Sequence, residues 1–144
     1  IAQSANTPYT KIAQSANQLN KKKTMNRYSY KNLNVYQDAK AFVVAVYKLV
    51  DEFPDSEKFA LCNQIRRAAI SVTSNIAEGV SRISAKEKIH FLEIAYASMM
   101  EVDSQLDISV DLEYISMEQY ELINKHINNI GRQLSVLRNK YKTL

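Results

Sequence analysis

One short sequence could hold a metal ion: Glu87-x-x-His90, a spacing that places a carboxylate and an imidazole on one helix face in di-iron helical proteins. Such a site needs this unit twice, and the only other histidine, His126, follows Ile123 where a second glutamate is required. At about 100° per residue, His90 also turns away from the side that carries Leu92. We therefore predict that His90 is a surface histidine and that the chain holds no metal.

Other reactive side chains give no catalytic set. Cys62, the single cysteine, falls on an apolar side of a predicted helix, where a small buried thiol is expected. Asp103, Asp107 and Asp111 form a row at intervals of four, which favours a solvated acidic face over a cation site because no loop supplies further ligands. No glycine-rich phosphate loop, G-x-S-x-G sequence or Cys/His metal spacing occurs. These absences predict a non-enzymatic protein without a cofactor.

The sequence RRAAISVTSNIAEGVSR, from Arg66 to Arg82, mixes polar groups that could recognise a ligand with small apolar residues. On a helix its apolar residues form a broad arc of roughly 200°. The first stripe of this arc contains Leu61, Ile65, Ala68, Val72, Ile76, Gly79 and Ile83. The second contains Cys62, Ala69, Ile70, Thr73, Ala77 and Val80. The small residues of the second stripe predict close approach to another helix, either in the same chain or in another subunit.

Five residues of this stretch remain open to either a structural or a recognition role. Arg66 falls inside the apolar arc and needs a partner if it is buried, and Asn75 lies at the border of the arc. For these two we favour structural roles. Arg67, Glu78 and Arg82 lie on the polar side, and Arg82 is the best candidate in this stretch for contact with a phosphate.

The elements that position these residues are four predicted helices. The first begins with Asn34 as a cap, with Gln37 in the reciprocal position, and stops before Pro54; the second covers about 57–81. Ser84 with Glu87, and Ser116 with its following residues, form capping boxes that open the third and fourth helices. Short connections between long helices predict an all-α, antiparallel, up-down-up-down four-helix bundle.

Composition supports this class. The chain has 144 residues, 46% of them hydrophobic and 24% charged, but only two glycines and two prolines, too few for the turns of an all-β fold. The longest mainly apolar run, 41–50, is about half of a bilayer span, and one cysteine cannot form an internal disulfide. We expect a cytoplasmic protein without a membrane segment.

Residues 1–24 differ from the rest of the chain. They repeat IAQSAN, contain four of the 19 Lys and Arg residues and no acid, and leave 15 basic against 15 acidic residues over 25–144. This composition predicts a disordered extension. Met25 stands directly before the first patterned segment, so we interpret 1–24 as a disordered or non-native extension and 25–144 as the helical domain.

The antiparallel arrangement predicts that charge separates along the helix axes. One end collects basic residues, namely Arg27, Lys31, Arg82, Lys86, Lys88, Arg138, Lys140 and Lys142. The other collects acidic residues, namely Asp51, Glu52, Asp55, Glu57, Asp107, Asp111, Glu113, Glu118 and Glu121. The basic end could meet phosphates and the acidic end a basic partner, although helix dipoles and solubility explain part of the pattern. Tyr28, Tyr30 and Tyr141 lie beside basic residues and could stack on bases or cap the core.

The sequence resembles the small bacterial four-helix-bundle proteins encoded by intervening sequences of 23S rRNA genes. The likeness covers about Tyr30 to Tyr141 and is strongest in Q-I-R-R-A-A-I-S-V-x-S-N-I-A-E-G at Gln64 to Gly79. It also includes L-x-V-Y-Q-x-A from Leu33, F-P-x-x-E from Phe53 and F-L-E-I-A from Phe91. Two positions depart from it: Tyr36, where tryptophan is frequent, and Ala97-Ser98, where Gly-Ser is frequent.

This resemblance implies a ring-like homo-oligomer, by analogy a pentamer, and supplies no catalytic residues. Related proteins are accessory to the reverse transcriptases of diversity-generating retroelements. Our first hypothesis is a bundle that binds structured RNA or DNA through Arg82, Lys86, Lys88, Arg138, Lys140 and Lys142. The alternative is a protein-interaction scaffold, or an accessory subunit for a nucleic-acid enzyme such as a reverse transcriptase, that docks a basic protein partner.

Overall fold

The protein is all-α over the residues that the computed structural model describes, which are 8–21 and 28–144. The long helices are α2 (Asn34–Val50), α3 (Leu61–Ser81), α4 (Ala85–Asp111) and α5 (Met117–Lys142). Shorter elements are α1 (Pro8–Lys21) and the 3₁₀ turns η1 (Ser29–Asn32) and η2 (Asp55–Glu57). The predicted all-α class is confirmed. Among the described helices, none is long and apolar enough to cross a membrane.

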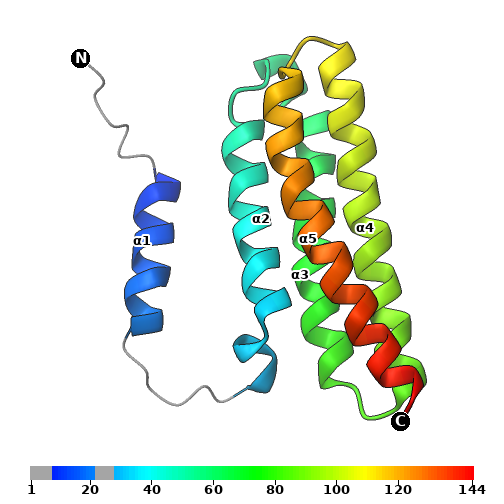
Figure 1. The fold of residues 1–144 in the computed structure, drawn as a ribbon. Coiled ribbons are helices and arrows are strands. Elements are labelled where there is room, and N and C mark those ends of the chain that lie inside the picture. The colour runs from blue at the N-terminus through cyan, green and yellow to red at the C-terminus, as the bar shows by residue number, and fades with distance from the viewer. Residues whose placement is uncertain (1–7, 22–27) are drawn as a thin grey trace.

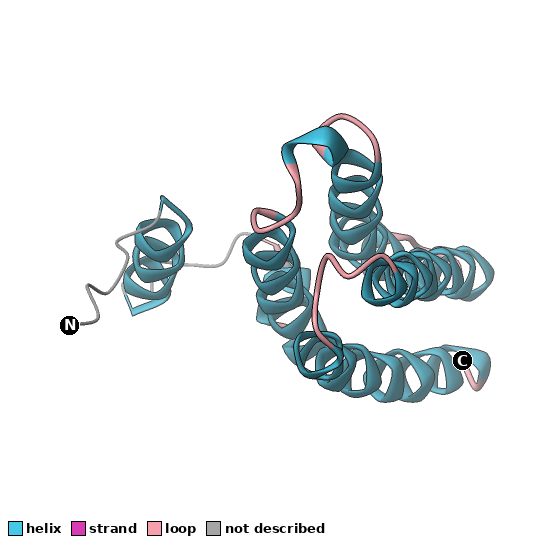
Figure 2. Ribbon diagram, turned by 90° about the horizontal axis from the view of Figure 1, so that it is seen from above, coloured by secondary structure: helices cyan, strands magenta, loops and turns pink. Residues whose placement is uncertain are grey.

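The four long helices alternate in direction along the chain (Figure 1). Helix α2 packs on α3 and α5, α3 packs on α4, and α4 packs on α5. Seen from above, α5 crosses the set obliquely and carries the C-terminus toward the side occupied by α3 and α4 (Figure 2). The ends of α3 and α5 and the start of α4 therefore lie at one end of the molecule, with η1 at the same end.

The core consists of apolar stripes on the long helices. In α4 the buried residues include Leu92, Ala95, Met99, Val102 and Leu106, each at most 1% exposed. In α5 the buried residues are Ile123, Ile127, Ile130 and Leu134. In α3 the first stripe is buried from Ile65 to Gly79. Ile83 is the exception at 98% exposed, because α3 ends at Ser81 and the chain turns to an extended conformation at Arg82.

The helix starts agree with the sequence at two places and differ at two. Ser84 accepts a hydrogen bond from the Glu87 backbone N–H, and Ser116 forms the full capping box with Gln119. The predicted Asn34 cap is wrong, because η1 precedes α2, Leu33 takes the cap position and the Gln37 side chain donates to the Lys31 carbonyl. The predicted start of the second helix near 57 is also too early.

The later start of α3 follows from the turn before it. Asp55–Glu57 form a 3₁₀ turn after Pro54, and α3 begins only at Leu61. The Glu57 carboxylate then accepts the Leu61 backbone N–H at 3.2 Å, which satisfies one of the free donors at the helix N-terminus.

The N-terminal extension contains one helix. Pro8–Lys21 form α1, which lies beside α2 (Figure 1). Alanine, glutamine and lysine favour helix, and the Tyr9 ring meets the Tyr47 ring of α2 edge to face, with centroids 6.2 Å apart. Residues 1–7 and 22–27, and with them Arg27, lie outside the described ranges. That 1–24 are a disordered or non-native extension stays a prediction.

Candidate nucleic-acid interface

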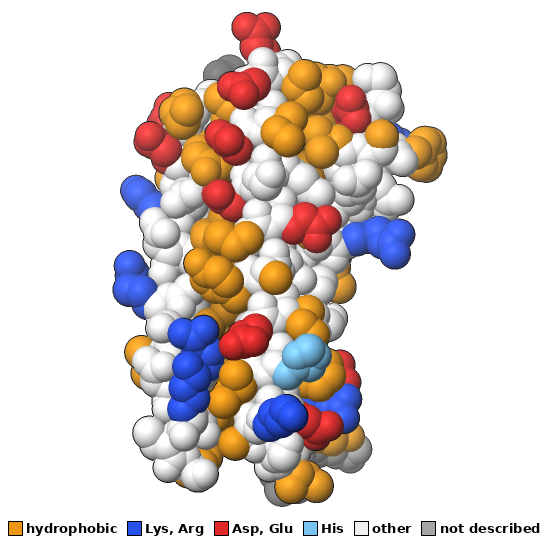
Figure 3. Space-filling model, turned by 90° about the vertical axis from the view of Figure 1, so that its right-hand side faces the viewer, with side chains coloured by type: hydrophobic (Ala, Val, Ile, Leu, Met, Phe, Trp, Pro, Cys, Tyr) orange, Lys and Arg blue, Asp and Glu red, His pale blue; other side chains and the backbone are white. Residues whose placement is uncertain are grey.

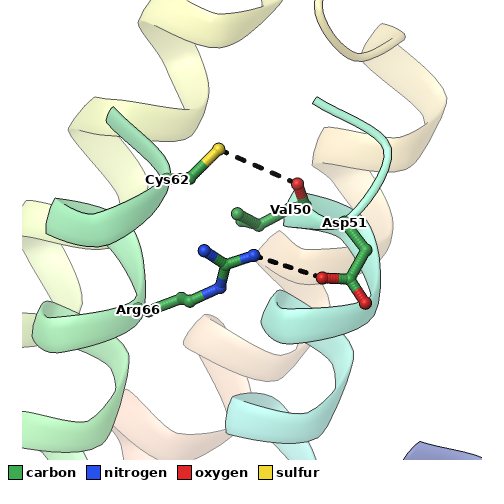
Figure 4. Close-up of polar contacts among 4 residues, drawn as sticks. All are labelled: Val50, Asp51, Cys62 and Arg66. Atoms are coloured by element: carbon green, nitrogen blue, oxygen red, sulfur yellow. Dashed lines mark hydrogen bonds and ion pairs between the residues drawn. The ribbon is translucent and has the colours of Figure 1, made fainter. Parts of the chain in front are cut away.

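Arg66 joins α3 to the end of α2. Its guanidinium is 3.2 Å from the Asp51 carboxylate (Figure 4). It also lies over the Tyr47 ring, 5.8 Å from the ring centroid. One turn earlier, the buried Cys62 thiol donates to the Val50 carbonyl at 3.9 Å, and burial raises its pKa. Arg66 is thus half-buried with a partner inside its own chain, which gives it a structural contact.

Asn75 belongs to a polar contact between α3 and α4. Its amide donates to the Ser71 carbonyl at 2.8 Å and to the Ser71 hydroxyl at 2.9 Å. The Ser71 hydroxyl in turn lies 2.8 Å from the Ser98 hydroxyl of α4. Ser98 is buried, so the three side chains satisfy one another where the two helices approach. The structural role that we favour for Asn75 is consistent with these contacts.

Gly79 allows the end of α3 to approach the start of α4. A Cβ atom added at Gly79 would lie 3.0 Å from the Phe91 Cβ and 3.2 Å from the Lys88 carbonyl oxygen. Both neighbours belong to or adjoin the α4 backbone and have little room to move. Gly79 is therefore required by packing rather than by an unusual backbone angle, since its φ is not positive.

Arg82 has partners inside the chain. Its guanidinium pairs with Glu78 one turn earlier and lies over the Phe91 ring, 4.6 Å from the centroid. These contacts hold the side chain beside the start of α4, and it remains 39% exposed. Arg67, by contrast, is exposed on the outer side of α3 and forms no ion pair with a carboxylate among the described residues.

Basic side chains from α4 and α5 meet at the same end. Lys88 donates to the Val80 carbonyl at 2.9 Å and lies over the Tyr141 ring at 5.1 Å, which links α3, α4 and α5. The Arg138 guanidinium is 3.9 Å from the Glu93 carboxylate, a loose ion pair. Lys86, Lys140 and Lys142 are exposed, and no carboxylate in the described part of the chain pairs with them.

We call the end that carries Arg82, Lys86, Lys88, Arg138, Lys140 and Lys142 the basic end. The opposite end carries nine acidic residues, of which all but Glu57 are exposed, and we call it the acidic end. On the face shown in Figure 3, acidic side chains concentrate toward the upper end and the largest group of Lys and Arg side chains lies in the lower half. The fold brings together charges that are dispersed in the sequence.

Aromatic rings add to the basic end. The Tyr28 and Tyr30 rings stack with centroids 6.3 Å apart, and Lys31 lies over Tyr28 at 5.7 Å. Tyr30 meets Tyr36 edge to face at 4.9 Å. Tyr36 and Tyr141 are half-buried, and burial raises the pKa of both phenols. Tyr141 thus caps the core, whereas Tyr28 is 58% exposed.

The groups considered for metal binding are separated by the fold. His90 is exposed, as predicted, and its ring meets Phe91 rather than a carboxylate. Asp103 accepts hydrogen bonds from Tyr120 at 2.8 Å and from Asn124 at 3.0 Å, while Asp107 and Asp111 are exposed. Over residues 8–21 and 28–144, no group of three or more His, Cys, Asp or Glu is placed to hold a metal ion.

The sequence analysis did not predict one feature that lies next to the basic end, a groove between α4 and α5. It has a volume of about 530 Å³, and its lining includes Tyr96, Gly131, Arg132 and Arg138. Gly131, a glycine within the predicted fourth helix, was the sequence signal that the two helices leave space there. We call this feature the α4–α5 groove.

Comparison with known proteins agrees with the sequence resemblance. A model of the 23S rRNA-intervening sequence protein family matches residues 31–136. A solved structure from Bacteroides thetaiotaomicron, described as a protein of unknown function from the S23 ribosomal protein family, is 30% identical with a TM-score of 0.67. The match covers 72% of this chain and 97% of that one. No curated protein matches the chain.

The fold and the charged ends define a class of small all-α proteins in which long helices alternate in direction and basic and acidic side chains separate along their axes. Within this class, the chain belongs to the family of 23S rRNA-intervening sequence proteins.

Proposed function

We propose that the protein is a non-enzymatic, cytoplasmic, ring-like homo-oligomer of four-helix-bundle subunits that binds structured RNA or DNA through its basic end. The observation that carries this proposal is the convergence on one end of basic side chains from α4, from α5 and from Arg82 directly after α3. Three of them, Lys86, Lys140 and Lys142, are exposed and unpaired with any carboxylate of the described residues. Unpaired surface cations gain most from phosphate contact, because they release counterions from the nucleic acid without first breaking an ion pair.

The outer surface of α3 supports the proposed oligomer. The second apolar stripe predicted there divides in two: Ala69 is buried, while Ile70 is 43% exposed and Thr73 and Ala77 are half-buried. A small apolar surface of this kind suits close packing of a second copy. Repetition of the basic end around a ring, a pentamer in our proposal, would multiply individually weak phosphate contacts.

The proposal is tested by combining Arg82→Ala, Lys86→Ala and Lys88→Ala and measuring RNA affinity by fluorescence anisotropy. The matched control removes the same charge elsewhere by Lys48→Ala, Lys58→Ala and Lys125→Ala. We expect the first variant to bind much more weakly than the control and to lose about one unit of salt slope for each phosphate contact removed. Equal affinities of the two variants would contradict a role for the basic end.

The acidic end supports a second candidate, a scaffold that docks a basic protein such as a nucleic-acid polymerase. Eight exposed carboxylates gather there, including Glu52, Asp111 and Glu118. Such a field attracts a partner of opposite charge. Co-purification from the native host with and without nuclease separates the candidates: a protein complex that survives nuclease supports the scaffold, and one that dissociates supports nucleic-acid binding.

A further inference from the structure

The α4–α5 groove lies next to the basic end and has the chemistry of a base-binding site. Its volume of about 530 Å³ falls within the range of small-ligand pockets. Its lining combines apolar side chains, among them Leu92, Ile127 and Leu134, with the basic Arg132 and Arg138 and the acidic Glu93. Hydrophobic side chains also lie next to Lys and Arg side chains in the lower half of the face shown in Figure 3. The groove thus pairs apolar with cationic side chains, the two kinds of surface that a nucleotide needs.

Tyr96 supplies an aromatic ring in this groove. Its side chain is 48% exposed, although the nearby α4 residues Ala95 and Met99 are fully buried. Its ring extends over Gly131 of α5: a Cβ atom added at Gly131 would lie 3.7 Å from the Tyr96 Cε2 atom. Because Gly131 has no side chain, no larger group from this position of α5 covers the ring. An exposed ring in a concave apolar site can stack on any base.

Two arginines of α5 border the same groove. Arg132 is exposed, and no ion pair holds it within the described residues. Arg138 has a buried Nε atom without a hydrogen-bond acceptor, and its only ion pair there, with Glu93, is 3.9 Å long. A phosphate oxygen would satisfy this guanidinium better than Glu93 does. Asn128 and Ser135 add polar groups at the edge.

We propose that the α4–α5 groove takes one unpaired base of a bound nucleic-acid strand, with Tyr96 stacking on the base and Arg132 and Arg138 contacting the adjacent phosphates. This inference rests on the proposed nucleic-acid binding and adds its substrate class: single-stranded segments, such as loops of a structured RNA. A base inside a duplex is covered on both faces by its neighbours and cannot enter the groove. The groove is also separate from the outer surface of α3, so a ring can form while the groove stays open.

The test compares two RNA probes, a single-stranded oligoadenylate of about a dozen nucleotides and a duplex of similar length. The variant Tyr96→Leu keeps an apolar side chain but removes the ring, and Tyr96→Phe keeps the ring. We expect Tyr96→Leu to weaken single-strand binding about tenfold and leave duplex binding unchanged, with Tyr96→Phe close to wild type. Gly131→Leu, which fills the groove without changing charge, should give the same selective loss.

A control for general aromatic adhesion is Phe59→Leu, because Phe59 is 85% exposed and adjoins the acidic end. It should leave both affinities unchanged. Circular dichroism melting of each variant monitors the fold, and Tyr96→Phe keeps the test valid if Tyr96→Leu alters stability.

Each outcome decides the proposal. If wild type binds both probes and Tyr96→Leu binds each of them as tightly as wild type does, the base site is overturned. The proposed nucleic-acid binding then stands, and an acidic protein segment becomes the better occupant of the groove. If wild type binds neither probe at low salt, both proposals fall. If adenosine monophosphate alone binds as tightly as the oligonucleotide, the groove is a free-nucleotide site and the strand proposal is overturned.

Discussion

At the scale of single residues, the chain's two glycines have opposite surroundings. A Cβ atom at Gly79 meets the Phe91 Cβ at 3.0 Å, whereas one at Gly131 finds only ordinary contacts, at 3.7 Å from Tyr96 and 3.8 Å from Met99. Neither glycine has a positive φ. Substitution by alanine should therefore change the free energy of unfolding in opposite directions at the two positions.

We predict that Gly131→Ala raises the free energy of unfolding by up to about 1 kcal/mol, because alanine favours a helix over glycine. Gly79→Ala should lower it by about 1 kcal/mol or more, since the clash with α4 outweighs that gain. Urea denaturation at fixed pH measures both. A Gly79→Ala variant as stable as Gly131→Ala would contradict the close approach of α3 and α4.

Tyr120 gives a pH dependence. Its hydrogen bond to Asp103 is the largest cause that raises its pKa from 10.0 to about 12, followed by burial. A folded-state pKa above the unfolded one contributes stability that is complete below pH 10 and is lost as pH rises toward 12. Between these values, wild type should lose stability more steeply than Tyr120→Phe, as measured by urea unfolding. Parallel curves for the two proteins would exclude this contribution.

The role of a residue could be predicted only where the hydrophobic pattern of its helix showed that it needs a partner. Arg66 lies inside an apolar arc, so a partner was expected, and Asp51 and Tyr47 fill that role. No spacing in the sequence indicated the Asp103 contact with Tyr120, because the two residues are 17 positions apart on different helices. The same holds for the amides of Asn129 and Gln133, which donate to Asp38 at 3.0 and 2.6 Å.

At the scale of elements, helix starts with local hydrogen bonds were the most predictable. The Ser116 hydroxyl accepts the Gln119 N–H at 3.1 Å, and the Gln119 side chain accepts the Ser116 N–H at 2.9 Å. Both bonds are encoded in four consecutive residues. The start of α2 could not be read in this way, because η1 before it changes which residue caps the helix.

The Ser116 cap should stabilise the protein measurably. Ser116→Ala removes the acceptor for the Gln119 N–H, and we expect a loss of about 1 kcal/mol in the free energy of unfolding. Ser116→Asp, which keeps an acceptor and places a negative charge at the helix N-terminus, should restore most of it. Thermal melting of the three proteins gives the comparison, and equal melting temperatures would show that the cap contributes nothing.

At the scale of the whole molecule, alternating helix direction converts dispersed charges into two ends of opposite sign. This could be predicted from the sequence, because the order of helices decides which termini meet. The oblique course of α5 and the groove beside it could not, because they depend on how Tyr96 and Gly131 fit together in three dimensions. The family match over 31–136 agrees with the helical part and leaves α1 outside.

Assembly is the first prediction at this scale. Ile70 is 43% exposed on α3, so Ile70→Asp should leave the subunit folded but place a charge in the proposed subunit contact. We expect light scattering to show an oligomer for wild type and a monomer for Ile70→Asp at micromolar concentration. The exposed Val136 on α5 provides a control, since Val136→Asp should remain oligomeric. A wild-type protein that is a stable monomer contradicts the ring.

The most direct test of the central claim is the salt dependence of RNA binding by the wild-type protein. Because the basic end presents cations from α4, from α5 and from Arg82 after the end of α3, we predict that the logarithm of the association constant falls steeply and linearly with the logarithm of salt concentration. A slope of several units fits contact with several phosphates. Binding that does not change with salt, or no binding at low ionic strength, would contradict the claim that the basic end is a nucleic-acid interface.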